Sequence, residues 1–260
     1  MPKISSSESI AETIPLKSNP GQRLLQFSGE RLICGFSNRW AGNMSLCYAD
    51  RQDSLVNRKI FLSWLGVRQD NLVCAKQAHG SAVKYVLPQD AGKGAFSYEG
   101  SIADTDAFVT DEKNLALAMF TADCLSVFFY DPKRKVIGLA HAGWRGSRDK
   151  VTQKTINFMR ETFKTRPEDL YLGLGPSIRS CCYEVSPGME EAFPGGLLKR
   201  QGKYYLDLIA TNRRQALDCG AQEERIFDSR ICTFCAKRNC FSFRREGEIA
   251  GRMISVIMLK

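Results

Sequence analysis

Both histidines of this 260-residue chain, and one of its 10 cysteines, lie in short segments that could perform chemistry. His79 lies in the segment QAHG, Cys124 ends TADC, and His141 opens HAGWRG. Two imidazoles and one thiolate suit a borderline-soft divalent ion such as zinc, and three protein ligands leave a fourth position open for water or substrate. The three residues are therefore candidate ligands of one catalytic metal ion.

The long gaps between these residues match no local zinc motif, so two other interpretations stay open. Cys124 and His141 could form a thiolate–imidazole pair for nucleophilic catalysis without a metal. Alternatively, the chain holds two separate polar histidines and a buried cysteine. The spacing alone does not decide among the three interpretations.

Each of the three segments lies where a predicted strand gives way to a turn, among small residues that let backbones approach closely. Short apolar runs bounded by turn residues are the pattern of strands. They predict strands at residues 31–35, 72–76, 83–87, 107–110, 115–120, 126–130, 136–140, 170–173 and 253–259. Helical spacing and capping residues predict helices at 54–65, capped by Asp53 and ended by Gly66, at 148–163 and at 207–219.

The order of these elements predicts the fold class. Many strands and few long helices, without a regular alternation, favour a single mixed-sheet α/β domain over a doubly wound fold. We place this domain at residues 23–260. Residues 1–22 are rich in Ser and Pro and lack periodicity, which predicts a flexible N-terminal tail.

The composition indicates which partners and which cellular compartment to expect. The chain has 37 Lys and Arg against 28 Asp and Glu, a formal net charge of +9 that favours anionic partners such as phosphate. The basic residues are dispersed and no RNA-binding motif is present, so nucleic acid is not an expected partner. No apolar run approaches the ~18 residues of a membrane span, and no secretory signal opens the chain. We therefore expect a cytoplasmic protein, away from membranes, with mostly reduced cysteines.

Beyond the three segments, a series of motifs in a fixed order closely resembles the YfiH/YlmD-like family. The motifs are FSNR, GNMS, QAHG, TADCLSVFFYDP, HAGWRG, GPSI, CCYEV, CTFC, FSFRR and GR, from about residue 33 to the end. This family was first labelled multicopper polyphenol oxidoreductase or laccase and later interpreted as purine nucleoside enzymes. Some bacterial members are called peptidoglycan editing factors.

The resemblance implies one metal ion, zinc or alternatively copper, held by His79, Cys124 and His141. It implies a four-layer α/β/β/α arrangement similar to the catalytic domain of cytotoxic necrotizing factors. The implied activity is phosphorolysis of adenosine, inosine and methylthioadenosine to free base and ribose 1-phosphate, together with adenosine deamination. Purine nucleosides and phosphate would be its partners, and the sequence leaves open whether it acts as a monomer or a homodimer.

Two alternative functions accompany this prediction: an amidase that edits a peptidoglycan precursor, and weak phenol oxidation at a single copper. Full laccase chemistry is excluded by composition, because a four-copper enzyme holds its metals mainly through imidazoles and this chain has two histidines. Zinc-assisted hydrolytic or deaminating chemistry fits the residues better.

Several further residues are candidates for catalysis or substrate binding. Cys124 and His141 are the candidate catalytic residues, with Asp123 as an acid that moves protons or, alternatively, as a group that hydrogen-bonds the turn. Arg39 and Arg145 are candidate phosphate ligands, with structural ion pairs as the alternative. Gln77 would orient His79 or donate to the substrate, and Trp144 would pack the turn or stack on a purine.

The chain departs from the family pattern at Ser126, at Arg179 and at Trp40-Ala41, and these changes could alter substrate preference. A separate group, Cys232, Cys235 and Cys240, resembles half of a zinc site. No fourth ligand lies near it in sequence, so reduced core cysteines are favoured there over a second metal.

Overall fold

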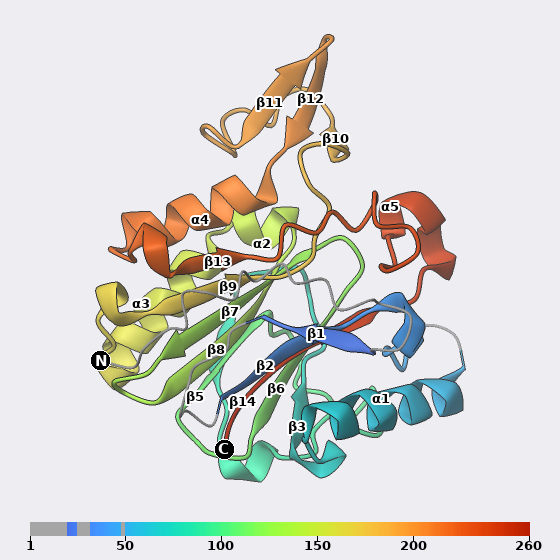
Figure 1. The fold of residues 1–260 in the computed structure, drawn as a ribbon. Helices are drawn as coiled ribbons and strands as arrows, with labels where there is room; N and C mark the ends of the chain where they lie inside the picture. The colour runs from blue at the N-terminus through green and yellow to red at the C-terminus, as the bar shows by residue number, and fades with distance from the viewer. Residues whose placement is uncertain (1–19, 25–31, 48–49) are drawn as a thin grey trace.

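The computed structural model describes residues 20–24, 32–47 and 50–260 (Figure 1). The strands are β1 (Gly21–Arg23), β2 (Leu32–Ser37), β3 (Leu72–Cys74), β4 (Val83–Tyr85), β5 (Ala107–Thr110), β6 (Ala116–Thr121), β7 (Leu125–Asp131), β8 (Val136–Ala142), β9 (Tyr171–Leu174), β10 (Glu184–Val185), β11 (Leu197–Arg200), β12 (Lys203–Leu206), β13 (Ile226–Asp228) and β14 (Met253–Leu259). The helices are α1 (Arg51–Leu65), α2 (Trp144–Arg148), α3 (Val151–Phe163), α4 (Leu208–Asp218) and α5 (Phe243–Glu246). No helix in the described ranges is long and apolar enough to cross a membrane.

Two mixed sheets form the centre of the described part of the molecule. One has the order β13-β9-β7-β8-β5-β4 and the other the order β1-β2-β14-β6-β3, and a small sheet, β10-β12-β11, projects from them (Figure 1). Most of the predicted tail, residues 1–19, lies outside the described residues. Gly21 and Gln22, which we assigned to the tail, instead pair with Ser37 and Phe36 of β2, because β1 begins there.

The two sheets pack face to face, and the alternation of side chains along each strand shows how. In β7, Phe128 faces the other sheet, where it joins a core with Leu117 of β6 and Ile257 of β14. Its neighbour Phe129 faces the opposite way, into a core shared with α3 and α4. Val256 of β14 likewise packs against α1. Because strand side chains alternate between faces, these cores define four layers, helix, sheet, sheet and helix, and confirm the predicted arrangement.

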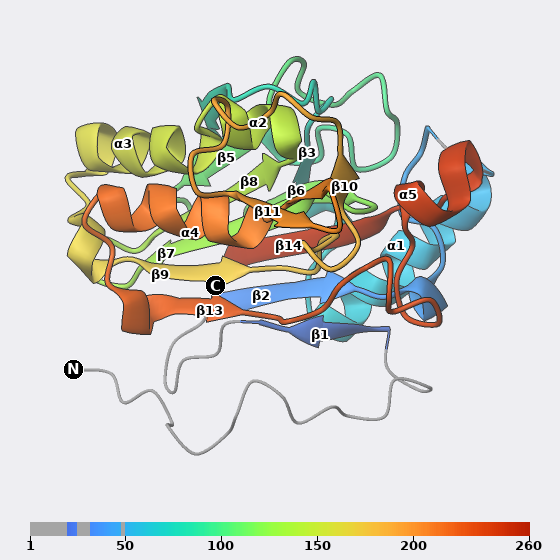
Figure 2. The same cartoon turned by 90° about the horizontal axis from the view of Figure 1, so that it is seen from above.

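The helices cover the outer faces of the sheets (Figures 1 and 2). On one side, α3 and α4 lie side by side and are joined by a buried hydrogen bond of 2.7 Å from Thr152 Oγ1 to Asn212 Oδ1. On the other side, α1 is capped at its N-terminus by Asp50, whose carboxylate accepts from the backbone of Gln52 and Asp53, and at its C-terminus by Gly66 with φ +73°. The predicted cap at Asp53 was therefore three residues late, while the predicted end is confirmed.

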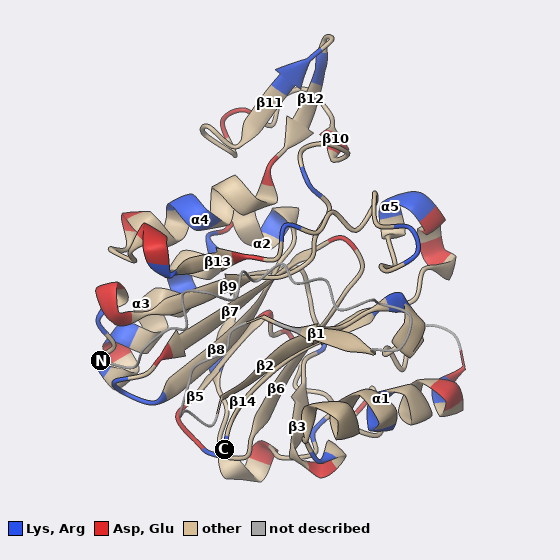
Figure 3. Ribbon diagram, viewed as in Figure 1, with Lys and Arg blue, Asp and Glu red and all other residues tan. Residues whose placement is uncertain are grey.

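The predicted helix at 148–163 was wrong at its start. Lys150 has φ +62°, which breaks the segment into the short α2 and a separate α3 that begins at Val151. The third predicted helix is confirmed, with Asp207 as its N-terminal cap. Lys and Arg residues lie on many elements, among them α4, α5 and the β11–β12 hairpin, so the positive charge is dispersed as expected (Figure 3).

The pairing of three neighbouring strands places the candidate residues together. β7 and β8 run antiparallel with Ser126 opposite His141, so Cys124, just before β7, lies beside the end of β8. β5 pairs with the other edge of β8, with Ala107 opposite Ala140. As a result Asp106, just before β5, lies at the same end, where its carbonyl accepts from His141 N at 2.7 Å.

Candidate active site

Three ligand-type side chains meet at this end of the β7–β8 pair. The ligand atoms of His79, Cys124 and His141 all lie within 4.8 Å of one another. The two imidazole rings meet edge to face, with centroids 4.8 Å apart. His141 is buried, Cys124 is partly buried and His79 is exposed, so the group lies between the core and the surface. This convergence excludes the interpretation of separate, unrelated histidines.

A buried carboxylate that sequence reasoning missed organises two of the three residues. Asp106 Oδ1 lies 2.8 Å from His141 Nδ1 and accepts from His79 N at 3.0 Å, while Oδ2 accepts from Gly80 N at 2.7 Å and Ala78 N at 3.2 Å. These bonds hold the turn in which His79 adopts φ +59°, uncommon for a residue with a side chain. They also leave His141 Nε2 as the nitrogen that faces a ligand. The feature of the sequence that could have indicated Asp106 is its position directly before the predicted strand at 107–110.

The electrostatics of the group favour a thiolate. Burial opposes ionisation of Cys124, but the neighbouring imidazoles of His141 and His79 outweigh it and hold the pKa of the thiol well below its usual value. Burial likewise opposes charge on His141, yet the thiolate and the carboxylate of Asp106 raise its pKa. The arrangement thus suits either a cation among the three residues or a thiolate–imidazolium pair.

Two glycines of the HAGWRG segment, Gly143 and Gly146, lie too close to neighbouring atoms to carry a side chain. A methyl group on Gly143 would lie 2.9 Å from Cys124 Sγ and 3.6 Å from His79 Cδ2. One on Gly146 would lie 2.7 Å from the carbonyl oxygen of Gly80. The expectation that small residues permit close backbone approach is confirmed at Gly146, whereas Gly143 makes room for the side chains of Cys124 and His79.

The three residues line a cavity of about 480 Å³, a size typical of small-molecule sites. Aromatic side chains line part of it: Tyr98, Phe120, Trp144, Tyr183 and Phe243. Four arginines line it as well: Arg58, Arg145, Arg244 and Arg252. Asp123 is the only acidic residue among the described lining residues. A cavity with aromatic walls and several guanidinium groups suits a planar base together with an anion.

The lining arginines differ in their hydrogen-bond and ion-pair partners. Arg58 is buried and is held by the carbonyls of Met44, Gly94 and Ala95, so it supports the wall. Arg145, the predicted phosphate ligand, is exposed at the cavity over the ring of Trp144, with no ion-pair partner among the described residues. Arg244 and Arg252 were not predicted as substrate-binding residues, although both lie in motifs of the family resemblance, FSFRR and GR.

Two other predicted substrate ligands have structural partners. Arg39 does not line the cavity; its Nη1 donates to Glu246 Oε1 at 2.6 Å, which is the ion-pair alternative. Gln77 does line the cavity, but both of its amide atoms bond the backbone of Phe120, at 2.9 and 2.8 Å. Gln77 therefore fastens the segment that carries His79 to β6.

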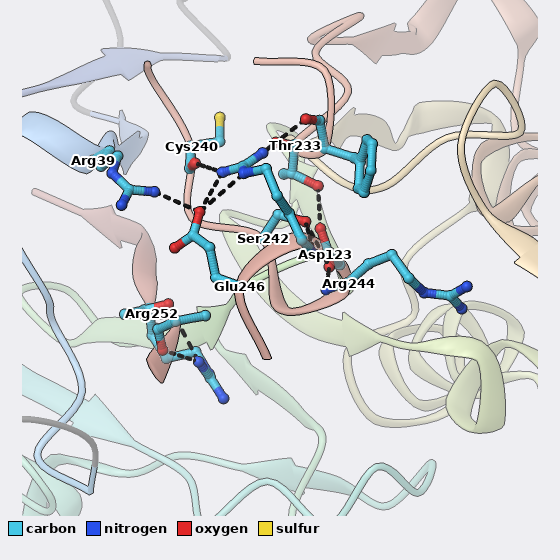
Figure 4. A network of polar contacts seen from close by, with 12 residues as sticks. Arg39, Asp123, Thr233, Cys240, Ser242, Arg244, Glu246 and Arg252 are labelled. Carbon is cyan, nitrogen blue, oxygen red and sulfur yellow. Dashed lines mark hydrogen bonds and ion pairs between the residues drawn. The ribbon is translucent and has the colours of Figure 1, made fainter. Parts of the chain in front are cut away.

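Asp123 lies at the centre of a hydrogen-bond network (Figure 4). Its Oδ1 accepts from Thr233 Oγ1 at 2.6 Å, and its Oδ2 accepts from Ser242 Oγ at 3.0 Å and from Arg244 N at 2.6 Å. The residue has φ +94° and is 8% exposed. With both oxygens engaged, the geometry favours the turn-stabilising role over the proton-transfer role.

The departures from the family pattern lie away from the cavity wall. Ser126 is buried and accepts from Ser255 Oγ of the facing sheet at 2.9 Å. Arg179 forms an ion pair with Asp228. Trp40 is exposed and donates to Asn239. None of the three is among the described residues that line the cavity.

The chain matches one family model and is similar to several known proteins. Residues 34–260 match the family model described as multi-copper polyphenol oxidoreductase laccase. The chain is 33% identical over 217 residues to the purine nucleoside phosphorylase YlmD of Geobacillus stearothermophilus, covering 80% of this chain and 79% of the relative. It is 29% identical over 205 residues to the adenosine deaminase RL5 of an unknown prokaryotic organism, covering 75% of this chain and 78% of the relative. The crystal structure of a hypothetical protein YfiH from Bacillus licheniformis superposes with a TM-score of 0.89 at 31% identity, covering 94% of this chain and 98% of that one.

Proposed function

Because the chain belongs to the YfiH/YlmD family, whose model is described as multi-copper polyphenol oxidoreductase laccase, we propose that it is a zinc-dependent purine nucleoside phosphorylase that also deaminates adenosine. The observation that carries this proposal is the convergence of His79, Cys124 and His141 on a cavity lined by arginines and aromatic rings. Relatives named for phosphorolysis and for deamination support the two activities.

The donor set fits a single zinc ion. Two imidazoles and a thiolate favoured by its neighbours are ligands that zinc prefers, and three ligands are typical of catalytic zinc. Asp106 would orient His141 and the turn of His79 toward the ion. When bound, zinc supplies a Lewis acid with an open coordination position. The two histidines of the chain are too few for a multicopper cluster, whatever the family label suggests.

The chain's own residues suit the phosphorolysis step. An oxygen of hydrogen phosphate attacks C1′ of the ribose as the bond from C1′ to N9 of the purine breaks. The proton of hydrogen phosphate passes to the departing purine, which gives ribose 1-phosphate and the neutral free base. Arg145 and Arg244 would hold the phosphate, because guanidinium groups match its oxygens. The rings of Tyr183 and Phe243 would pack against the purine. The walls would thereby hold phosphate and nucleoside in a productive orientation.

The test separates the two activities by their need for phosphate. Zinc-loaded protein is incubated with inosine, adenosine or methylthioadenosine, with and without phosphate, and the products are resolved by chromatography. We expect free base and ribose 1-phosphate only when phosphate is present, and conversion of adenosine to inosine with or without it. Absence of every one of these products, with cleavage of a UDP-linked muramyl peptide precursor instead, would contradict the proposal in favour of the amidase alternative.

A further inference from the structure

A second group of metal-type ligands lies outside the site described above. The Sγ atoms of Cys181, Cys182, Cys232 and Cys235 all lie within 4.8 Å of one another. The sequence grouped Cys232 and Cys235 with Cys240 and offered no nearby fourth ligand. The fold supplies the missing sulfurs from the loop after β9, and Cys240 is not part of the group.

The distances between the sulfurs are close to those of tetrahedral coordination. Cys181 Sγ lies 3.5 Å from Cys232 Sγ and 3.9 Å from Cys235 Sγ, and Cys182 Sγ lies 3.3 Å from Cys235 Sγ. Four sulfurs at about 2.3 Å from one zinc ion, at the corners of a tetrahedron, are about 3.8 Å apart. A disulfide requires about 2.0 Å, and all four cysteines are free. We propose that these four cysteines bind one zinc ion in a closed, structural site.

The backbone holds the two cysteine-bearing loops in place for this role. Ser177 and Cys232 form a parallel bridge, in which Thr233 N donates to Ser177 O at 3.0 Å. On the other loop, the N–H groups of Cys182 and Tyr183 both donate to the carbonyl of Arg179 at 2.8 Å. These backbone bonds fix the position of both cysteine-bearing loops.

The location of the cluster gives the ion a structural task. The Cys181–Cys182 loop leads into Tyr183, which lines the cavity. The other loop contains Thr233, whose Oγ1 donates to Asp123 Oδ1 at 2.6 Å. Asp123 directly precedes Cys124 in the sequence. An ion bound to all four sulfurs would therefore tie together two loops that support one wall of the cavity. Four protein ligands leave no open position, so this ion would not take part in the chemistry.

The site is open to metal exchange from one side. Cys232 is buried, Cys182 is partly buried, and Cys181 and Cys235 are exposed. Zinc can therefore enter and a chelator can remove it without unfolding the core.

Zinc content tests this inference separately from the proposed function. We expect about two zinc ions per chain in the reduced wild type, with three- and four-ligand sites both filled. Cys124→Ala and Cys235→Ser should each lose one ion, and the double variant should lose both. Cys219→Ser and Cys240→Ala, which change cysteines outside both groups, should keep both. If the four-cysteine site binds zinc but the three-ligand site does not, the wild type binds one ion and Cys235→Ser binds none. Equal zinc in Cys235→Ser and wild type overturns the second site.

A spectroscopic measurement tests the cluster with all four cysteines in place, so its result does not depend on whether Cys235→Ser folds. Cys124→Ala, which retains all four cysteines of the cluster, is loaded with Co²⁺. Intense sulfur-to-cobalt charge-transfer bands and the visible bands of a tetrahedral tetrathiolate are expected, and the same variant loaded with zinc should give four sulfurs at about 2.3 Å by X-ray absorption. Absence of the charge-transfer bands, or a mass showing that the cluster has oxidised to disulfides in reduced, zinc-supplemented cells, overturns the inference.

Discussion

Asp106 Oδ1 lies 2.8 Å from His141 Nδ1, with both side chains buried. The same carboxylate accepts three backbone N–H groups from the turn that carries His79. One aspartate thus sets the ring orientation of one candidate ligand and the backbone position of another. Burial opposes its ionisation, but His141 and the backbone donors keep its pKa below the usual value. Asp106 is therefore a positioning group for two of the three candidate ligands.

Replacing Asp106 by Asn should weaken metal binding. The amide keeps the size of the side chain but turns one acceptor into a donor that faces the N–H groups of Ala78 and Gly80. Loss of such an outer partner costs about 10–100-fold in metal affinity. Zinc affinity, measured by competition with a chelating dye, checks this. Asp104→Asn is the matched control, since Asp104 is exposed with φ +47°, and equal affinities in the two variants would contradict the role of Asp106.

Gly143→Ala tests the close packing of the ligands. Gly143 has φ −68°, which alanine adopts freely, so the substitution adds no backbone strain. Its methyl group would lie 2.9 Å from Cys124 Sγ and displace that ligand. We expect zinc affinity to fall by roughly tenfold or more, which is about 1.4 kcal/mol. Gly100→Ala, whose methyl would meet its nearest atom at 3.6 Å, should bind zinc like the wild type; unchanged affinity in Gly143→Ala would show that the ligands have room to move.

The fold class could be predicted from strand-sized apolar runs, whereas the four layers and the convergence of the three ligands were implied by the family resemblance that the motifs carry. The details that failed depend on single residues. The predicted helix at 148–163 has a continuous helical pattern, yet Lys150 takes the left-handed conformation and divides it. Asp50 and Asp53 both fit a helix cap, and the choice depends on which one has free backbone donors two and three residues later.

The roles of charged residues around the site were harder to predict for a different reason. Whether an arginine faces a cavity or a carboxylate depends on contacts far apart in sequence, such as Arg39 with Glu246. The cysteine cluster shows the same limit, because Cys181 and Cys235 come from separate loops. Spacing along the chain carries no information about such pairs.

Arg145→Ala should affect phosphate more than nucleoside. Arg145 faces the cavity without an ion-pair partner among the described residues, and a hydrogen bond to a charged group contributes about 1.5–3 kcal/mol. We expect the KM for phosphate to rise by about 10–100-fold, with a much smaller change in the KM for inosine. Steady-state kinetics with each substrate varied in turn measures both. Arg148→Ala, in the same helix but paired with Asp149, is the control, and a parallel rise in both constants would assign Arg145 to the nucleoside instead.

Asp123→Asn distinguishes a positioning role from proton transfer. Asparagine tolerates the positive φ of Asp123, so the change isolates the hydrogen bonds. Its amide nitrogen cannot accept from Ser242 or Arg244, and leaving buried donors unpaired costs about 1–3 kcal/mol each. We expect the free energy of unfolding, from urea titration of the metal-free protein, to fall by about 2–4 kcal/mol. Thr233→Val, which removes one donor to the same carboxylate, should lower it by about 1 kcal/mol. A variant as stable as the wild type but with a greatly reduced kcat would assign Asp123 to proton transfer.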